Sequence, residues 1–308
     1  MNAAQGLDIG TSLVAPTLQA WGTEEQQSRY LPNIEQRREQ WCQLFSEPGA
    51  GSDLASLSTR AERDGDRWRV NGQKVWSTLA HVADYGILLA RTGTAEARHA
   101  GITCFAIDMR QTGVTVRPLR QMTGDADEFN EVFLDDAHVA DSDRIGAEGA
   151  GWQVAKTVLT SERAMLGGLP RVGGGRAEQL IAFACEDGAW HDPRIRDSLT
   201  ALLVAERVLQ LTNLRVALER QAGHRPAAAT TVKLARSTLV RRLEAMSMSL
   251  RGPAALAWDD TNHAGVGPAA RFLHTPCETI IGGTSEIQRN IIAERVLGLP
   301  REPRGRTA

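Results

Sequence analysis

The chain has 308 residues, of which 42% are hydrophobic and 23% are charged, and its formal net charge is −2. This composition suits two packed domains and argues against disorder as the main state. The balanced charge leaves no extended basic face for nucleic acid, and no apolar run approaches the roughly 18 to 20 residues of a membrane span.

Helical spacing governs the chain up to about residue 43. Leu13, Val14, Leu18 and Trp21 recur on one helical face. The segment Thr23-Glu24-Glu25-Gln26 follows them, and its pattern predicts a capping box that opens the next helix.

Between about Cys42 and Gly146 the hydrophobic period changes to two, in short runs separated by Gly, Asp and Asn. The pattern predicts a small antiparallel β domain, either a barrel or a sandwich. From Gly151 onward helical patterns return, most clearly over 193–222, 226–250 and 284–297. The glycines at 173–175, with Gly167 and Gly168 before them, are expected to interrupt a helix, and they could also widen a ligand pocket.

This order of helices, strands and helices predicts an α+β fold. We expect three parts: a remnant of an N-terminal helical domain (1–41), a central antiparallel β domain (42–146) and a C-terminal helical bundle (147–308). The four cysteines are far apart and form no metal-binding or redox pair, so no metal site is expected. With no secretory leader, buried free thiols in a reducing, cytoplasmic setting are the simplest interpretation.

Two segments of the β region combine small or aromatic residues with hydroxyl groups. Leu44–Asp53 carries glycines that let backbone N–H groups approach a ligand, although a tight turn between strands would look the same. Asn71–Thr78 is predicted to be a hairpin turn followed by a strand, with Trp76 and Thr78 on one face. A planar ring could rest on Trp76, although a tryptophan in the core of the domain is equally reasonable.

These segments, in this order, resemble the acyl-CoA dehydrogenase family. The resemblance also includes Trp21–Gln26, Phe129–Leu134 and the tail Gly282–Arg289, and so spans the chain. It implies a flavoprotein of fatty acid β-oxidation that binds FAD, dehydrogenates an acyl-CoA to the 2-enoyl-CoA and passes electrons to an electron-transfer flavoprotein. It also implies an oligomer, commonly a tetramer, in which the flavin contacts a neighbouring subunit.

The resemblance assigns the site residues. Those expected to contact FAD are Gln43, Leu44, Phe45, Ser46, Gly51, Ser52, Trp76, Ser77, Thr78, Ser249, Gly252, Thr284 and Glu286. Those expected near the acyl-CoA are Ser52, Arg163, Gly282 and Gly283. Within these sets, Thr78 is directed to the flavin N5 edge, Thr284 and Glu286 to the adenosine half, and Arg163 to the CoA portion.

The reaction needs a base that removes the Cα proton while hydride passes from Cβ to flavin N5. Many relatives carry a glutamate directly before the Gly-Thr of the tail, where this chain has Gly282. Glu162 is the candidate instead, because it falls within an apolar helical stripe at positions 154, 155, 158, 165, 166 and 169. Loss of hydration there should raise its pKa toward neutrality. The competing interpretation is an outward Glu162 paired with Arg163 or Arg171. Isovaleryl-CoA and long-chain acyl-CoA dehydrogenases resemble the chain in this Glu-Arg placement.

Departures from the family pattern keep other functions open. The Arg-x-x-Phe-Gly signature is absent, with Glu186–Trp190 in its place, and Ser249 lies where relatives often have a longer side chain. A non-catalytic or half-catalytic subunit of a heteromeric enzyme is one alternative, and an oxidase or monooxygenase of the same fold is another. Relative to the family, the chain is expected to be N-terminally truncated, which would expose apolar surface.

Overall fold

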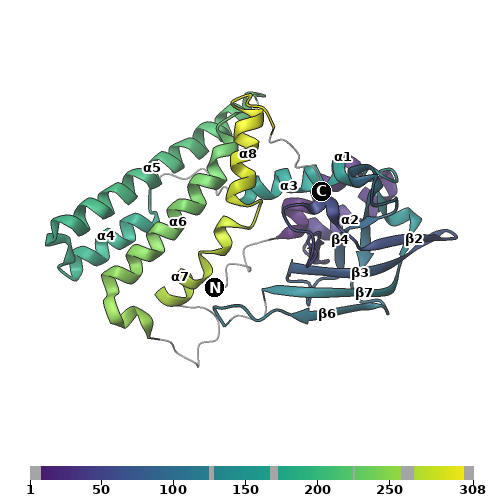
Figure 1. Ribbon diagram of the computed structural model, residues 1–308, viewed down its shortest axis with the longest axis horizontal. Helices are drawn as coiled ribbons and strands as arrows, with labels where there is room; N and C mark the ends of the chain where they lie inside the picture. Colours follow the sequence, from purple (N-terminus) through teal and green to yellow (C-terminus); the bar gives the residue numbers. More distant parts are fainter. Residues whose placement is uncertain (1–7, 125–127, 167–172, 225, 258–266, 302–308) are drawn as a thin grey trace, which may run out of the picture. The chain divides into compact units, whose positions relative to one another are not determined.

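The computed structural model describes residues 8–124, 128–166, 173–224, 226–257 and 267–301. Their contacts divide the chain into two compact units, Met1–Glu162 and Arg163–Ala308. Strands and short helices form the first unit, and helices form the second (Figure 1).

The N-terminal unit begins with a π-helical turn (Gly10–Val14) and the helices α1 (Ala15–Trp21) and α2 (Glu24–Glu35). The predicted capping box is confirmed: Gln26 N donates to Thr23 Oγ1 at 3.2 Å, and Thr23 N donates to Gln26 Oε1 at 3.1 Å. Both bonds satisfy backbone donors that a helix start leaves open.

Eight strands form one sheet. They are β1 (Trp41–Leu44), β2 (Arg60–Asp64), β3 (Arg67–Thr78), β4 (Tyr85–Arg91), β5 (Ile102–Asp108), β6 (Val114–Pro118), β7 (Phe129–Ala140) and β8 (Arg144–Ile145). Their order is β6-β7-β3-β2-β4-β5-β8, with β1 paired to β4. The expected antiparallel domain is therefore corrected to a mixed sheet, because β1 and β2 both run parallel to β4.

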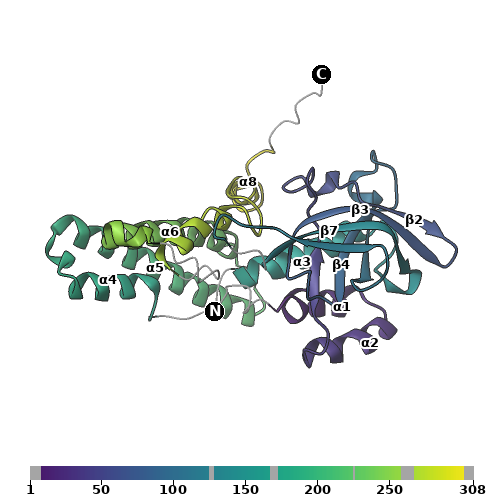
Figure 2. The same cartoon turned by 90° about the horizontal axis from the view of Figure 1, so that it is seen from below.

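The sheet separates two cores. Alternate side chains of β4 and β5 enter opposite clusters: Ile87 and Leu89 join one with α1 and α2, and Leu88 and Phe105 join the other. In the second cluster, the rings of Trp68 on β3 and Phe105 on β5 lie 5.5 Å apart although two strands separate β3 from β5. The sheet therefore curls around this cluster, while α1 and α2 cover its other face (Figure 2).

The predicted hairpin at Asn71-Gly72 is wrong, since β3 runs unbroken from Arg67 to Thr78. The turn lies earlier, at Gly65-Asp66, where Asp64 pairs with Arg67 and Gly65 has φ 66°. This two-residue loop with a left-handed glycine suits the twist of a hairpin. Asn71 instead faces a bulge in β7, where it accepts from Asp136 N at 2.9 Å.

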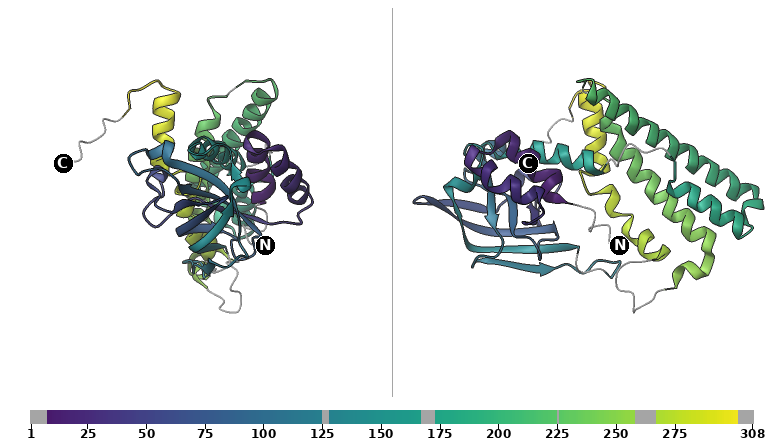
Figure 3. Two further views of the ribbon diagram at one scale, coloured as in Figure 1. Left: turned by 90° about the vertical axis from the view of Figure 1, so that its right-hand side faces the viewer. Right: turned by 180° about the vertical axis from the view of Figure 1, so that it is seen from behind.

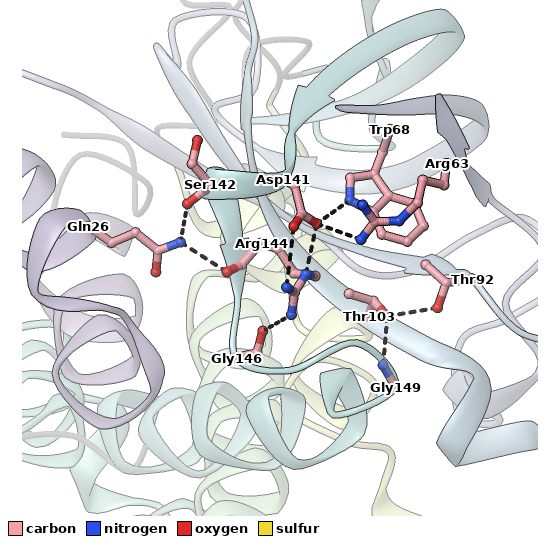
Figure 4. A network of polar contacts seen from close by, with 10 residues as sticks. All are labelled: Gln26, Arg63, Trp68, Thr92, Thr103, Asp141, Ser142, Arg144, Gly146 and Gly149. Carbon is pink, nitrogen blue, oxygen red and sulfur yellow. Dashed lines mark hydrogen bonds and ion pairs between the residues drawn. The ribbon is translucent and has the colours of Figure 1, made fainter. Parts of the chain in front are cut away.

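A polar network fixes the segment that leads into α3 (Gly151–Leu166), the helix that carries Glu162. Asp141 Oδ1 accepts from Trp68 Nε1 at 2.8 Å, from Arg63 at 3.1 Å and from Arg144 Nε at 3.0 Å (Figure 4). The capping glutamine Gln26 donates to the carbonyls of residues 142 and 144. The start of α3 is thereby tied to both α2 and the sheet.

The first half of helix α3 is anchored in the N-terminal unit. Trp21 Nε1 donates to Thr157 Oγ1 at 3.0 Å, and Val154, Ala155 and Val158 are completely buried in the core beneath α1 and α2. The expected domain boundary at 146/147 follows the change from strands to helices. The boundary between the compact units falls later in the chain, after Glu162, because these apolar contacts hold most of α3 against the sheet.

The C-terminal unit contains α4 (Arg176–Glu186), α5 (Pro193–Gln221), α6 (Ala229–Arg251), α7 (Pro268–His274) and α8 (Ser285–Arg295). The three predicted helices correspond to α5, α6 and α8. Helices α4, α5 and α6 share one apolar core, and they lie side by side in Figure 3 (right). Gly167, Gly168, Leu169 and Arg171 lie outside the described residues.

The cysteine expectation is corrected in part. Cys42 and Cys104 are buried free thiols, whereas Cys185 is exposed and Cys277 is half-buried. Cys185 follows the buried Ala184 on α4, and neighbouring helix positions point to different sides.

Candidate active site

The glycine turn is joined to the tryptophan strand by a backbone hydrogen bond. Glu47 and Ala50 exchange two backbone bonds of 3.0 Å, which close the turn over Pro48 and Gly49. Directly before it, the carbonyl of Ser46 accepts from Val75 N at 2.9 Å. The two segments that the sequence singled out are therefore brought together.

Beneath this junction lies a buried ion pair. Lys74 Nζ donates to Glu47 Oε1 at 2.8 Å, and the two side chains are 0% and 3% exposed. Lys74 also donates to the carbonyl of Phe45 at 3.1 Å, while Glu47 accepts from Ser58 N at 2.6 Å and Thr59 N at 2.9 Å. Sequence reasoning missed this pair. The signal was available, because the alternation Trp68, Val70 and onward places position 74 on an inward face.

Electrostatics keep both partners of this pair charged at neutral pH. Burial by itself would raise the pKa of Glu47, but the Lys74 ammonium and hydrogen bonds from residues 58, 59 and 74 outweigh it and lower the pKa to about 2. For Lys74, burial lowers the pKa to about 8 in spite of the Glu47 charge.

Trp76 lies on a β-bulge. Lys74 pairs with Val132 and Ser77 with Asn130, so β3 has one residue more than β7 across this stretch. Trp76 has φ 61°, a left-handed conformation that is costly for a bulky side chain. The residue is 60% exposed, and its ring touches that of Phe129 edge-on, with the centroids 5.8 Å apart. The interpretation of Trp76 as a core residue is therefore wrong.

The other candidate flavin residues of this unit differ in exposure. Thr78 is half-buried and shares the more open face of β3 with Trp76, whereas Ser77 is completely buried. The side chains of Leu44 and Phe45 enter the two cores, so only their backbone groups could meet a ligand. Gln43 and Ser46 are half-buried, and Gly51 and Ser52 are exposed.

Glu162 lies beside the start of the candidate flavin segment. It is half-buried on α3, and its Oε2 accepts from Gln43 Nε2 at 3.4 Å, across from β1. One turn earlier, Val158 is completely buried. The expected rise in the Glu162 pKa stays a prediction.

The tail residues begin a helix. Thr284 is the N-cap of α8, where its Oγ1 accepts from Ile287 N at 3.3 Å. Backbone hydrogen bonding, then a hydrogen bond from Thr284, lowers the pKa of the exposed Glu286. Gly282 and Gly283 precede the cap with φ 64° and 92°, a region that favours glycine.

The structure does not bring all C-terminal candidates together. The Lys233 charge acts on Glu286, which places the start of α8 near the beginning of α6. Ser249 and Gly252 lie at the other end of α6, roughly 24 Å away along the helix at about 1.5 Å per residue. Ser249 belongs to α6 itself, within the helix that the sequence predicted over 226–250. Arg163 is half-buried in the last turn of α3.

The part of the chain that the structure describes contains neither a membrane-spanning helix nor a metal cluster. No helix there is both long and apolar enough to cross a membrane. Within the same residues, no group of three or more His, Cys, Asp or Glu side chains is arranged to hold a metal ion.

Comparisons with known proteins agree with the motif pattern. Residues 42–137 match the model of the acyl-CoA dehydrogenase middle domain, and residues 149–297 match that of the acyl-CoA dehydrogenase C-terminal domain. The acyl-CoA dehydrogenase IpdE1 of Mycobacterium tuberculosis is 43% identical over 96% of this chain and 76% of its own.

Solved structures give the same result. The Tcur3481-Tcur3483 steroid ACAD matches with a TM-score of 0.87 and 27% identity, over 96% of this chain and 77% of its own. The ChsE4-ChsE5 complex from M. tuberculosis matches with a TM-score of 0.81 and 30% identity, over 96% and 78%. The chain is therefore an enzyme of the acyl-CoA dehydrogenase family.

Proposed function

We propose that the chain dehydrogenates an acyl-CoA thioester to the 2-enoyl-CoA with bound FAD, and that Glu162 removes the Cα proton. The observation that carries this proposal is the contact between Gln43 Nε2 and Glu162 Oε2 at 3.4 Å. This contact joins Glu162, the candidate base within the apolar helical stripe, to Gln43, the first residue of the candidate flavin segment.

The residues of the N-terminal unit fit a flavin. A Cβ added at Gly49 or Gly51 would meet no atom of the described residues within 4 Å, and neither residue has a positive φ, so these residues do not require glycine there. The exposed ring of Trp76 offers an apolar plane, held by a strained bulge that the rest of the fold must support. The Ser77 Oγ and Asn130 Oδ1 atoms, neighbours across β3 and β7, are buried and have no hydrogen-bond partner among the described residues.

Each residue has a distinct task in this proposal. The turn at residues 46–52 would hold the ring and pyrophosphate of FAD through backbone N–H groups, and Trp76 and Thr78 would flank the ring. Gln43 orients the Glu162 carboxylate, whose partly buried position weakens its hydration and strengthens it as a base. Arg163 and Ser52 hold the CoA thioester. Bound FAD would supply the hydride acceptor.

The proposed substrate class is a ring-bearing acyl-CoA. Its support is the likeness of the fold to a structure described as a steroid ACAD, at 27% identity. Linear, branched and steroid-ring acyl-CoAs should therefore differ as reductants of the flavin, with the steroid-ring thioesters reacting fastest. Electron transfer to an electron-transfer flavoprotein, rather than to oxygen, completes the proposed cycle.

An anaerobic bleaching experiment tests the base. The FAD-loaded protein should lose its visible flavin absorption when a reactive acyl-CoA is added. Glu162→Gln should keep FAD and slow bleaching roughly 10²- to 10⁴-fold, the usual contribution of a positioned base. Glu148→Gln, a change in the loop before α3, is the matched control and should bleach at the normal rate. Normal bleaching by Glu162→Gln would exclude Glu162 as the base.

A second candidate function is that of a non-catalytic or half-catalytic subunit in a heteromeric tetramer. Its support is the likeness to the ChsE4-ChsE5 complex, a structure of two different chains, together with the short side chain of Ser249 on α6, where relatives often have a longer one. An exposed apolar stripe on α5 offers a contact surface: Val204, Val208, Leu211 and Leu218 are each more than half exposed at helical spacing.

Purification alone and after co-expression with a second chain of this family separates the two candidates. FAD retained by a homotetramer supports the complete enzyme, and FAD retained only in the mixed complex supports the subunit role. Leu211→Glu should disrupt either assembly, as size-exclusion chromatography with light scattering would detect. An unchanged mass for that variant would exclude the α5 stripe as the contact.

A further inference from the structure

The buried pair Glu47–Lys74 lies directly under the two segments that carry the proposed flavin contacts. We infer that Glu47 and Lys74 are positioning residues of this site: their ion pair fixes the glycine turn against the bulge that presents Trp76. The inference rests on the proposed function, because it concerns how the same site is held in shape.

Three segments meet at the Glu47 carboxylate. Oε1 accepts from Lys74 Nζ at 2.8 Å and from Thr59 N at 2.9 Å. Oε2 accepts from Ser58 N at 2.6 Å and from Ser58 Oγ at 2.7 Å. One side chain therefore joins the glycine turn to the residues before β2 and to β3. Four donors on two oxygens suit a carboxylate and cannot all be matched by an amide.

The Lys74 ammonium completes the junction from the strand side. It bonds to Phe45 O at 3.1 Å and to Glu47, the residues on either side of Ser46. The carbonyl of Ser46 accepts from Val75 N, the residue between Lys74 and Trp76. A shift of Lys74 therefore moves both the turn and the bulge.

Neither side chain can touch a ligand, since they are 0% and 3% exposed. Their influence on a bound flavin is indirect and works through the geometry of the backbone. Strand β3 also packs closely against the residues before β2, because a Cβ added at Gly72 would overlap Thr59. A buried ion pair contributes little net stability, because removing both charges from water is costly. Its hydrogen bonds nevertheless fix the direction in which the two side chains meet, which suits a positioning role.

The test compares Glu47→Gln, Lys74→Met and the double variant with a control in the same unit. Each single variant should lose stability, because it leaves one buried charge without its partner. The double variant should regain most of that stability in urea unfolding, because it buries no charge. Asp141→Asn is the control: it breaks the network around Arg144 and Trp68 (Figure 4) without touching the turn.

Flavin binding distinguishes positioning from stability. In the double variant, the FAD dissociation constant should rise roughly tenfold or more, the scale expected when a supporting contact of a site is lost. The flavin absorption maximum and reduction potential should also shift. Asp141→Asn should lower the unfolding midpoint and leave all three flavin properties unchanged. Wild-type FAD affinity, absorption and potential in the double variant would overturn the inference.

Amide hydrogen exchange of the apoprotein separates failure of this inference from failure of the proposed function. Exchange at residues 46–53 and 75–77 should accelerate in the double variant and not in Asp141→Asn. If the wild-type chain binds no FAD, the proposed function fails, and this exchange alone decides the inference. Unchanged exchange in the double variant would overturn it whether or not FAD binds.

Discussion

Two glycine-rich segments, around Gly49 and Gly51 and around Gly173 to Gly175, look alike in sequence and differ in their surroundings. A Cβ at Gly175 would overlap the Glu206 carboxylate, whereas a Cβ at Gly49 or Gly51 would meet nothing within 4 Å in the part of the chain that the structure describes. Gly173 also has φ 91°. The chain itself requires glycine in the second segment but not in the first. The first segment is therefore where a ligand outside the chain has room to approach.

The difference has a chemical cause. In the C-terminal unit, Glu206 on α5 accepts from Arg176 N at 2.9 Å and from Ala177 N at 3.2 Å, so a carboxylate of the protein occupies the start of α4. Helix starts attract anions because their N–H groups are unpaired. Gly175 makes room for this carboxylate. The space beside Gly175 is therefore filled by Glu206, which argues against the expectation that the glycines at 173–175 widen an acyl pocket.

The largest expected effect is a loss of stability from a substitution in the second glycine-rich segment. Gly175→Ala should displace the buried Glu206 and destabilise the protein by about 3 kcal/mol, through overpacking and loss of the helix cap. Gly49→Ala is the matched control, and its unfolding free energy should stay within about 0.5 kcal/mol of wild type. Urea unfolding followed by circular dichroism measures both. Equal unfolding free energies for the two variants would show that the chain does not require glycine at position 175 more than at position 49.

A pH experiment sharpens the comparison at the first segment. The pKa of Glu47 is lowered from 4.5 to about 2, so its contribution is present above pH 4.5 and is lost as the pH falls toward 2. At pH 3 the wild type should have lost about 2 kcal/mol through this group. Glu47→Gln should be less stable than wild type at pH 7 and should show a flatter decline between pH 4.5 and pH 3. Parallel declines in the two proteins would contradict the lowered pKa.

The smallest effect is expected for a methyl group in the open turn. Gly51→Ala should leave the unfolding free energy nearly unchanged but weaken FAD binding about tenfold, equivalent to about 1.4 kcal/mol, because it blocks close approach to the backbone. Flavin fluorescence titration would measure the affinity. Gly188→Ala, in the C-terminal unit, serves as a control for a glycine whose added Cβ also meets nothing, although its φ of 82° adds strain. Undiminished FAD affinity in Gly51→Ala would mean that the turn holds no cofactor.

Local signals predicted the helices well. The capping box at Thr23 and Gln26 and the helices α5, α6 and α8 depend on contacts between residues a few positions apart, which the sequence displays directly. The hairpin was misplaced because Asn71-Gly72 and Asp64-Gly65 carry similar turn signals. The strand pairing distinguishes them: β3 pairs with β7 on both sides of Asn71-Gly72, so the chain turns at Gly65-Asp66 instead.

The candidate site was predictable in part. The glycine turn, the tryptophan strand and Glu162 stand out by residue type, and the structure brings Ser46 to Val75 and Gln43 to Glu162. The bulge that exposes Trp76 was not predictable, because a bulge depends on the register between two strands. The pairing of Glu47 with Lys74 was missed for a similar reason, since 27 positions separate them in the chain.

The sequence by itself determined the family, the order of helices and strands, and the residue types available for flavin and proton chemistry, because these follow from local periodicity and motifs. Only the tertiary structure decided that β1 and β2 run parallel to β4, that α3 packs with the sheet, and that a buried ion pair lies under the turn. Those features depend on contacts between distant segments, whose free energies no short stretch of sequence contains.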